Sequence, residues 1–182
     1  MSEAVQHKPG PAYGWGRLSG FGLVVAILTC GLDQALKFYL LLPFSLAERG
    51  RVALAPFVDL VLVWNTGISY GLFPQEGVIG ETALFAFKVA AVGFLWVWLS
   101  RATSRLTALS LGLIIGGAFG NAFDRFHWPG VMDFVLLHAE IAGQSFKWYV
   151  FNLADVAIVA GVAGLLYESV HSGGSRGAAK AP

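Results

Sequence analysis

Residues 106–125 read LTALSLGLIIGGAFGNAFDR, and this stretch decides the fold. It carries no charged residue before Asp124, and it matches the roughly 20 apolar residues that a membrane-spanning helix needs. Small residues at positions 116, 117, 118 and 120 let neighbouring helices approach closely. The stretch therefore predicts a transmembrane helix over residues 106–123 that packs tightly against other helices.

Three further apolar stretches extend this prediction to four spans. They cover residues 18–44, 82–99 and 150–167. The whole chain has 182 residues, of which 56% are hydrophobic and only 13% charged. A soluble domain carries about 25% charged residues, so the composition excludes an ordinary soluble enzyme. The net charge of +1 gives no basic surface for nucleic acid.

The distribution of basic residues predicts how the spans are oriented. One side of the membrane would hold Lys8, Arg17, Arg101, Arg105, Arg176 and Lys180. The other side would hold Arg49, Arg51 and Lys147, with Arg125 at a span end. Because basic residues favour the cytoplasm, both termini are expected there.

The resulting organisation is a single membrane domain with two short tails. We expect a cytoplasmic tail over residues 1–17, the four-helix domain over 18–170, and a disordered cytoplasmic tail over 171–182. The domain has two outer segments, 45–81 and 124–149. Residues 51–64 and 131–138 are rich in strand-forming side chains and predict a small outer β-sheet. The predicted class is a mainly α membrane protein with an extracytoplasmic sheet.

Ionisable residues inside the spans are functional candidates because they are costly in a membrane. Asp33 and Lys37 are four residues apart, so they share a helix face and can pair. The alternative is a charge pair that merely neutralises itself. Lys88 lies alone in the second span, and we assign it no role.

A polar group ends the third span. Asn121, Asp124 and Arg125 are spaced so that they share one face at its outer end. The glycines before them are explained by packing, whereas the polar trio indicates a site.

Two acids are expected at the same membrane depth as this trio. Asp133 lies in an apolar strand-like run, and Asp155 follows Asn152 near the outer end of the fourth span. Two carboxylates that face each other do not easily both ionise, so one keeps a proton. Such a pair can activate water for peptide hydrolysis, with one acid taking a proton and the other protonating the carbonyl oxygen.

Other chemistries are weaker. The sequence has no His-Glu-x-x-His and no Gly-x-Ser-x-Gly motif, and its four histidines are scattered. Ser69 or Ser145 with Lys147 would make a Ser/Lys dyad, but nothing favours it. Cys30 is the single cysteine and is expected to be a packing residue. No metal and no cofactor is expected.

These motifs together resemble one family. They are Asp33-Gln34 with Lys37, NTGISYG over 65–71, GGAFGNAFDR over 116–125, Val131-x-Asp133-Phe134 and Phe151-Asn152-x-Ala154-Asp155. Over residues 18–170 the chain resembles the lipoprotein signal peptidases, or signal peptidase II. These are bacterial inner-membrane aspartyl proteases with four transmembrane helices, which cut the signal peptide before the lipidated cysteine of a prolipoprotein.

The resemblance implies a role for each motif residue. Asp133 and Asp155 would be the catalytic dyad. Asn121, Arg125 and Asn152 would line the site and hold substrate carbonyls or carboxylates, and Asn65 would come from the outer sheet. Asp124 would pair with Arg125 or order the outer loop, while Asp33 and Lys37 would support the site. Gly120 and Ala154 belong to the same motifs.

The resemblance also implies partners and a location. The substrates would be diacylated prolipoproteins, membrane lipid would surround the helices, and the cyclic peptide globomycin would be an inhibitor. The site would lie near the outer face of the inner membrane. A small proton-coupled transporter or channel is the main alternative; a membrane scaffold and a presenilin-type protease are weaker ones.

Overall fold

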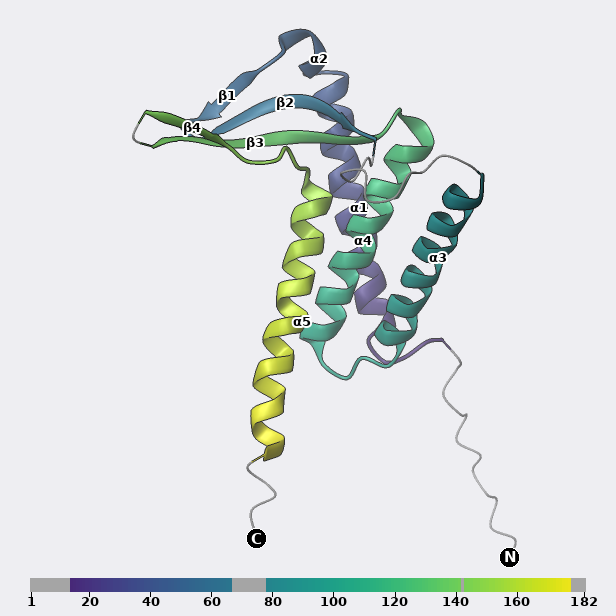
Figure 1. Cartoon of the computed structure of the whole chain (residues 1–182). Coiled ribbons are helices and arrows are strands. Elements are labelled where there is room, and N and C mark those ends of the chain that lie inside the picture. Colours follow the sequence, from purple (N-terminus) through teal and green to yellow (C-terminus); the bar gives the residue numbers. More distant parts are fainter. Residues whose placement is uncertain (1–13, 67–77, 142, 178–182) are drawn as a thin grey trace, which may run out of the picture.

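The computed structural model describes residues 14–66, 78–141 and 143–177, with side chains over 14–66, 89–141 and 143–171. In chain order the elements are α1 (Ser19–Leu41), α2 (Leu46–Arg49), β1 (Val52–Ala55), β2 (Val58–Asn65), α3 (Val78–Ser100), α4 (Arg105–His127), β3 (Val131–Ile141), β4 (Gln144–Lys147) and α5 (Leu153–Gly177). The four long helices form a bundle, and the sheet lies across one end of it (Figure 1). Both ends of the described chain lie at the opposite end of the bundle.

Helix α4 is the centre of the bundle and packs against α1, α3 and α5. Its glycines allow this contact on two sides. A Cβ atom at Gly116 would lie 2.5 Å from the carbonyl oxygen of Ala26, and one at Gly117 would lie 2.5 Å from that of Ala154. Since such distances are far below contact, only glycine lets α1 and α5 approach α4 this closely. The packing role predicted for these glycines is confirmed.

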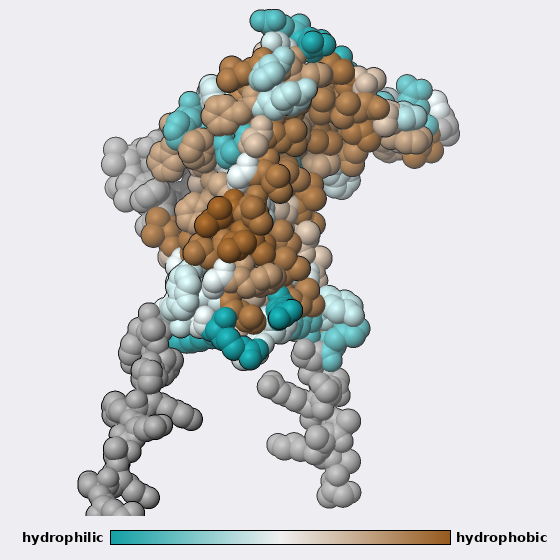
Figure 2. Space-filling view, turned by 180° about the vertical axis from the view of Figure 1, so that it is seen from behind, coloured by the Kyte–Doolittle hydropathy of each residue, from teal (hydrophilic) through white to brown (hydrophobic). Residues whose placement is uncertain are grey.

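Among the residues that the structure describes, three helices are long and apolar enough to cross a membrane: α1, α4 and residues 153–171 of α5. Helix α3 also has 23 residues, with a shorter apolar part over Val89–Ser100. Large apolar side chains such as Leu32, Phe94 and Val159 are exposed on the bundle. Figure 2 shows this hydrophobic surface along the helices, with polar patches near both ends. An apolar surface of this extent is what lipid covers in a membrane protein.

The sheet is antiparallel in the order β1-β2-β3-β4. Strands β2 and β3 pair from Val58 opposite Leu137 to Asn65 opposite Val131, with an irregularity between Leu60 and Val63. The sheet is fixed to the bundle by a hydrophobic core. This core is formed by Leu40, Leu46, Leu60, Met132 and Phe134. The last residues of β2 and the first residues of β3 thereby lie over the helix ends. The β3–β4 hairpin projects beyond the bundle (Figure 1).

Several predicted boundaries need correction. The strand predicted over 51–64 is two strands, because the chain turns between Ala55 and Val58, where Pro56 has no N–H for a ladder. The strand predicted over 131–138 reaches Ile141, and β4 and α2 were missed. Helix α5 continues to Gly177, so residues 171–177 of the predicted disordered tail are helical. A helix already formed extends with one hydrogen bond per added residue, even where side chains are polar.

Some predictions fall outside the described residues. They concern residues 1–13, residues 178–182 and Ser69. Positions 67–71 of the second motif also lie outside them, as does the side chain of Lys88.

Candidate active site

The two predicted acids meet where the sheet lies over the helix ends. Asp133 is on β3 and 3% exposed, and Asp155 is in the first turn of α5. One residue joins them: Asn152 donates from Nδ2 to Asp133 Oδ1 over 2.7 Å and from its backbone N to Asp155 Oδ2 over 3.1 Å. The shared contact brings together two acids that are 22 positions apart.

Asp155 is held by the cap of its own helix. Asn152 Oδ1 accepts a hydrogen bond from the backbone N of Asp155 over 2.9 Å, while Asp155 accepts from the backbone N of Asn152. This reciprocal pattern is a capping box, which satisfies amides that a helix N-terminus leaves unpaired. The spacing of three residues, seen in the sequence, produces it. The carboxylate of Asp155 thus lies in the first turn of α5, at the positive end of the helix dipole.

Two further asparagines complete the hydrogen bonds of the acids. Asn65, at the end of β2, donates to Asp133 Oδ2 over 3.1 Å. Asn121, on α4, donates from Nδ2 to Asp155 Oδ1 over 2.8 Å and accepts from Asn152 over 3.0 Å. Four elements therefore each contribute to one polar cluster, which we call the acid–amide cluster: Asn65, Asn121, Asp133, Asn152 and Asp155.

The environment of Asp133 favours its protonated form. Burial raises the pKa of Asp133, and the charge of Asp155 raises it further. Hydrogen bonds from Asn65 and Asn152 act in the opposite direction but do not cancel the effect. Asp133 is thus suited to carry a proton at a pH where a surface aspartate has lost it.

A second group of acids is joined to the first through Lys37, whose Nζ donates to Asn121 Oδ1 over 3.4 Å. Lys37 Nζ is 2.7 Å from Asp33 Oδ2 and 2.7 Å from Asp124 Oδ2, and all three side chains are buried. We call Asp33, Lys37 and Asp124 the acid–lysine cluster. The predicted pairing of Asp33 with Lys37 is confirmed. The predicted alternative of Asp124 with Arg125 is wrong, since Asp124 faces α1, where Lys37 reaches it.

The acid–lysine cluster connects the backbone of three elements. Asp33 Oδ1 accepts from the backbone N of Ala154 on α5 over 3.0 Å, and Asp124 Oδ2 accepts from that of Met132 on β3 over 3.0 Å. Asp124 thus orders the start of β3, as the other predicted alternative stated. The cluster positions the segments that carry Asp133 and Asp155.

Gly120 and Ala154 leave the space that this cluster needs. A Cβ atom at Gly120 would lie 2.7 Å from Asp33 Oδ2 and 3.5 Å from the Cβ of Ala154. Ala154 itself is fully buried against α4.

Gln34 was recognised from the sequence only as part of the first motif, without a role. Its amide donates to Asp33, to the carbonyl of Gly120 and to Asp124, over 3.2, 3.0 and 2.8 Å. The signal in the sequence that could have indicated this role is the presence of an uncharged amide inside an apolar span.

Arg125 is placed differently from the other predicted residues. It is exposed and donates to the carbonyl of Asn121, one turn earlier in its own helix, over 3.2 Å. This contact with Asn121 places it beside the acid–amide cluster.

The chain is similar in sequence to known proteins. Residues 25–171 match the sequence model of the family described as Signal peptidase (SPase) II. A lipoprotein signal peptidase of Nitrobacter hamburgensis is 55% identical over 148 residues, covering 81% of this chain and 90% of that protein. One of Methylobacterium sp. (strain 4-46) is 53% identical over 161 residues, covering 88% and 95%.

The fold is also found among solved structures. A bacterial membrane enzyme determined at 1.9 Å by the in meso method superimposes with a TM-score of 0.67 at 19% identity, over 86% of this chain and 96% of that one. The chain belongs to the signal peptidase II family. It is therefore a bacterial membrane peptidase, and the alternative of a transporter or channel finds no support.

Proposed function

We propose that this chain is an aspartyl endopeptidase that removes the signal peptide of diacylglyceryl-modified prolipoproteins, cutting before the lipidated cysteine. The observation that carries the proposal is the acid–amide cluster, in which Asn152 binds both Asp133 and Asp155. Family membership supplies the peptidase activity, and the curated relatives carry the name lipoprotein signal peptidase.

The different surroundings of the two acids assign their roles. Asp155, at the positive end of α5, is the base that takes a proton from the attacking water. The water oxygen bonds to the carbonyl carbon of the scissile peptide, and Asp133 gives its proton to the carbonyl oxygen. Asp133 suits this step because its pKa is raised by burial. Collapse of the tetrahedral intermediate breaks the C–N bond: the new amine takes up the proton held by Asp155, and one hydroxyl proton of the intermediate returns to Asp133 as the carboxyl product forms.

The remaining motif residues have supporting roles. Asn65, Asn121 and Asn152 orient the two carboxylates through the bonds described above. The acid–lysine cluster, together with Gly120 and Ala154, positions β3 and α5. Arg125, exposed beside the cluster, binds carbonyl oxygens of the substrate backbone.

The proposed setting is the bacterial inner membrane with four transmembrane helices, α1, α3, α4 and α5. Arg17, Arg101 and Arg105 lie at the helix ends away from the sheet, which supports a cytoplasmic position for that end. Residues 1–17 and the last residues of the chain then lie in the cytoplasm, and residues 18–170 form the membrane domain. The acid–amide cluster lies near the outer face, where surrounding lipid presents the diacylated substrate and where globomycin would compete with it.

Cleavage of a defined substrate tests the proposal. Purified protein in phospholipid nanodiscs is incubated with a diacylated prolipoprotein, and the products are analysed by mass spectrometry. The expected products are a free signal peptide and a mature chain that begins at the lipidated cysteine. Intact substrate, under conditions in which a relative cleaves it, would contradict the proposal.

The same assay tests the metal prediction. Because the proposed chemistry uses only two carboxylates and water, a chelator such as EDTA should leave the rate unchanged. Loss of cleavage on chelation, restored by one divalent metal, would show that the dyad does not act alone.

A further inference from the structure

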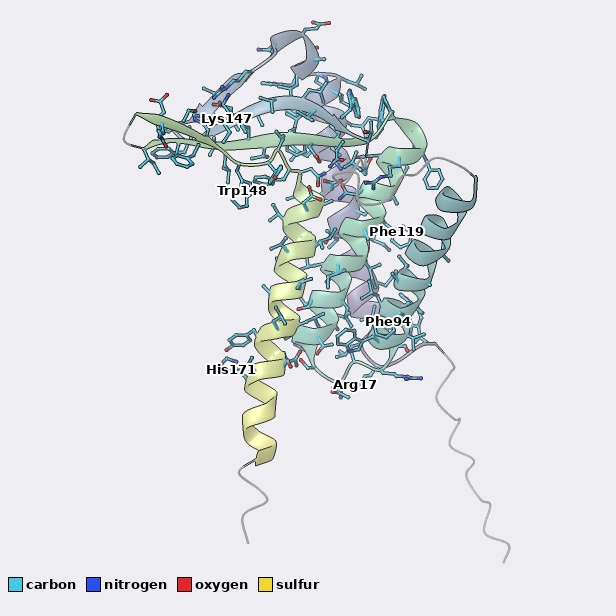
Figure 3. The ribbon with its side chains drawn as sticks, viewed as in Figure 1. Arg17, Phe94, Phe119, Lys147, Trp148 and His171 are labelled. Atoms are coloured by element: carbon cyan, nitrogen blue, oxygen red, sulfur yellow. The ribbon has the colours of Figure 1, made fainter. Side chains whose placement is uncertain are left out.

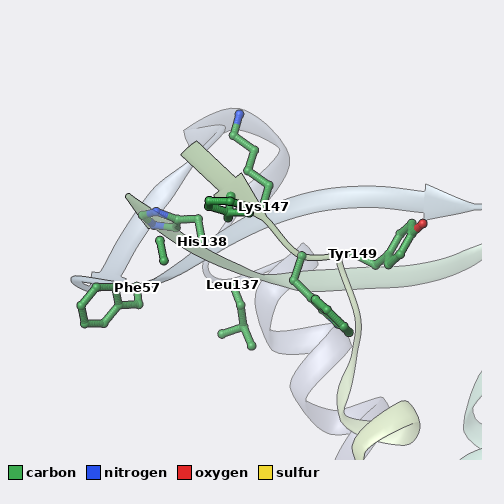
Figure 4. A pocket seen from close by; sticks show the side chains of 8 residues that line it. Phe57, Leu137, His138, Lys147 and Tyr149 are labelled. Atoms are coloured by element: carbon green, nitrogen blue, oxygen red, sulfur yellow. The ribbon is translucent and has the colours of Figure 1, made fainter. Parts of the chain in front are cut away.

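Two apolar hollows on the surface of the molecule differ in how a cation is placed beside them. One, of about 630 Å³, lies on the sheet, and there the ammonium end of Lys147 points away from Phe57 and Leu137 (Figure 4). The other, of about 310 Å³, lies on α3, at the end of the bundle away from the sheet. We call it the α3 hollow, and it is lined by Phe94, Val97, Trp98 and Arg101. Its lining thus joins three apolar side chains to one guanidinium group.

The four lining residues of the α3 hollow form one line along the helix. Steps of three and four residues bring side chains to the same helix face. The rings of Phe94 and Trp98 are in contact, with centroids 5.9 Å apart, and the two side chains are 64% and 41% exposed. Arg101 directly follows Ser100, the last residue of α3. Seven helical residues rise by roughly 10 Å, so the apolar line runs about that far before it meets the guanidinium group.

The segment before α1 is packed against the same end of α3. A Cβ atom at Gly16 would overlap the carbonyl oxygen of Ser100, so the two backbones touch there. Trp96, on α3, donates from Nε1 to the carbonyl of Gly14 over 3.0 Å. These contacts fix residues 14–16 beside the last turn of α3, and Arg17 follows them directly.

Two arginines at this end have no acidic partner among the side chains that the structure describes. Both Arg17 and Arg101 are exposed, and no described carboxylate forms an ion pair with either of them. Glu168, on α5, accepts instead from the hydroxyl of Thr107. Figure 3 shows Arg17 at the same end of the bundle as Phe94. The α3 hollow therefore lies at a net positive end of the molecule.

This combination of groups identifies the occupant of the hollow. An exposed apolar line on a helix that lies in lipid is covered by an acyl chain. The planar guanidinium group binds phosphate oxygens through paired hydrogen bonds. A phospholipid carries both groups, with its phosphate at the headgroup end of the chain.

We propose that the α3 hollow binds an anionic phospholipid, with the phosphate at Arg101 and one acyl chain against Phe94, Val97 and Trp98. Arg17 adds a second positive charge, which favours a headgroup of net negative charge over a zwitterionic one. The proposal rests on the membrane position proposed for α3, and not on the chemistry proposed for the acids. The bound lipid joins the segment before α1 to the end of α3.

Lipid retention measured by native mass spectrometry tests the proposal. The full chain, purified in detergent, is mixed with equal amounts of phosphatidylglycerol and phosphatidylethanolamine, and the bound lipids are counted. Arg101→Ala removes the charge, while Val97→Trp fills the hollow and keeps the charge. Lys147→Ala, at the exposed cation of the other hollow, is the matched control for a lost charge.

The wild type should retain phosphatidylglycerol in preference to phosphatidylethanolamine. Arg101→Ala should lower the amount of bound phosphatidylglycerol about fivefold, the effect expected for one arginine at a lipid surface. Val97→Trp should lower it as well, and Lys147→Ala should leave it unchanged. Equal losses in Arg101→Ala and Lys147→Ala would overturn the proposal, because they would show only general attraction to the positive charge of the protein. Full retention in Val97→Trp would also overturn it, since no acyl chain would then occupy the hollow.

A second measurement separates the lipid site from the membrane position of α3. In a Cys30→Ala background, Phe94→Cys is reconstituted in phospholipid nanodiscs and treated with a charged maleimide, with Thr103→Cys in the exposed loop as the reactive control. Position 94 should be protected and position 103 should react. Protection at 94 without a preference for phosphatidylglycerol would overturn the lipid site alone. Rapid reaction at 94 would overturn the membrane position of α3 and the lipid site with it.

Discussion

The two buried acid groups of this molecule differ in what compensates their charge. In the acid–lysine cluster, one ammonium group lies 2.7 Å from each of two carboxylates. In the acid–amide cluster, the donors to Asp133 and Asp155 are side-chain amides and a backbone N–H. Amides fix the direction of a carboxylate without supplying a charge. The comparison teaches that an aspartate beside a cation serves the structure, whereas an aspartate beside neutral donors suits the proposed catalysis.

The largest effect is expected in the acid–amide cluster, where we propose that catalysis takes place. Asp133→Asn and Asp155→Asn should each lower the single-turnover cleavage rate by roughly a thousandfold or more, because neither variant can both take and give a proton. The double variant should be little slower than either single one, since the two residues act as a unit.

Stability should change little in the same variants. Asp133→Asn loses about one hydrogen bond, worth about 1 kcal/mol, and no longer buries a second carboxylate close to Asp155. Melting temperature and cleavage are measured on the same preparations. A stable variant that cleaves at the wild-type rate would remove that residue from the mechanism.

The opposite outcome is expected for the acid–lysine cluster. Lys37→Met leaves Asp33 and Asp124 buried without their cation, which should destabilise the protein by about 3–5 kcal/mol. Thermal unfolding in detergent measures the loss, with Lys147→Met on the exposed sheet surface as the control. A Lys37→Met protein as stable as the wild type would show that the cluster does not hold the helices.

Gly120→Ala should give a smaller loss of stability. The added methyl group meets Asp33 Oδ2 at 2.7 Å, and crowding of this kind costs about 1–3 kcal/mol. The matched control is Gly93→Ala on α3, where a Cβ has no neighbour within 4 Å among the described residues. Equal melting temperatures for the two variants would contradict the crowding at Asp33.

The smallest effect concerns pH. The folded-state pKa of Asp133 is raised, so its protonated form contributes stability that is complete below the ordinary value of about 4 and is lost as the pH rises through the folded value. Relative to Asp133→Asn, the wild type should lose stability above about pH 4, by at most about 1.4 kcal/mol per pH unit. Melting curves that stay parallel from pH 4 to 8 would contradict the raised pKa.

Much of the fold follows from local sequence patterns. Apolar runs place all four long helices to within a few residues at most ends, because a run of about 20 apolar residues is itself the signal for a long helix. Spacings within a helix were equally informative: Asn152 with Asp155 gives the capping box, and Asp33 with Lys37 gives an ion pair.

Contacts between distant elements were harder to predict. The pairing of Lys37 with Asp124 spans 87 positions, and it depends on how α1 is rotated against α4, which contacts such as that of Gly116 with Ala26 determine. The hairpin strand β4 was missed because its four residues, Gln-Ser-Phe-Lys, have no strong strand preference. These residues form a strand because they pair with β3, and not because of their own preference.

The capped start of α5 also bears on how the enzyme is made. The groups that contact Asp133 and Asp155 come from β2, α4 and α5, and Asp33 on α1 holds the amide of Ala154. A ribosome delivers these segments in order, and α5 arrives last. A nascent chain that has released the elements from α1 to β4 has Asp133 but neither Asn152 nor Asp155. The growing polypeptide therefore lacks the proposed dyad until the final helix is released.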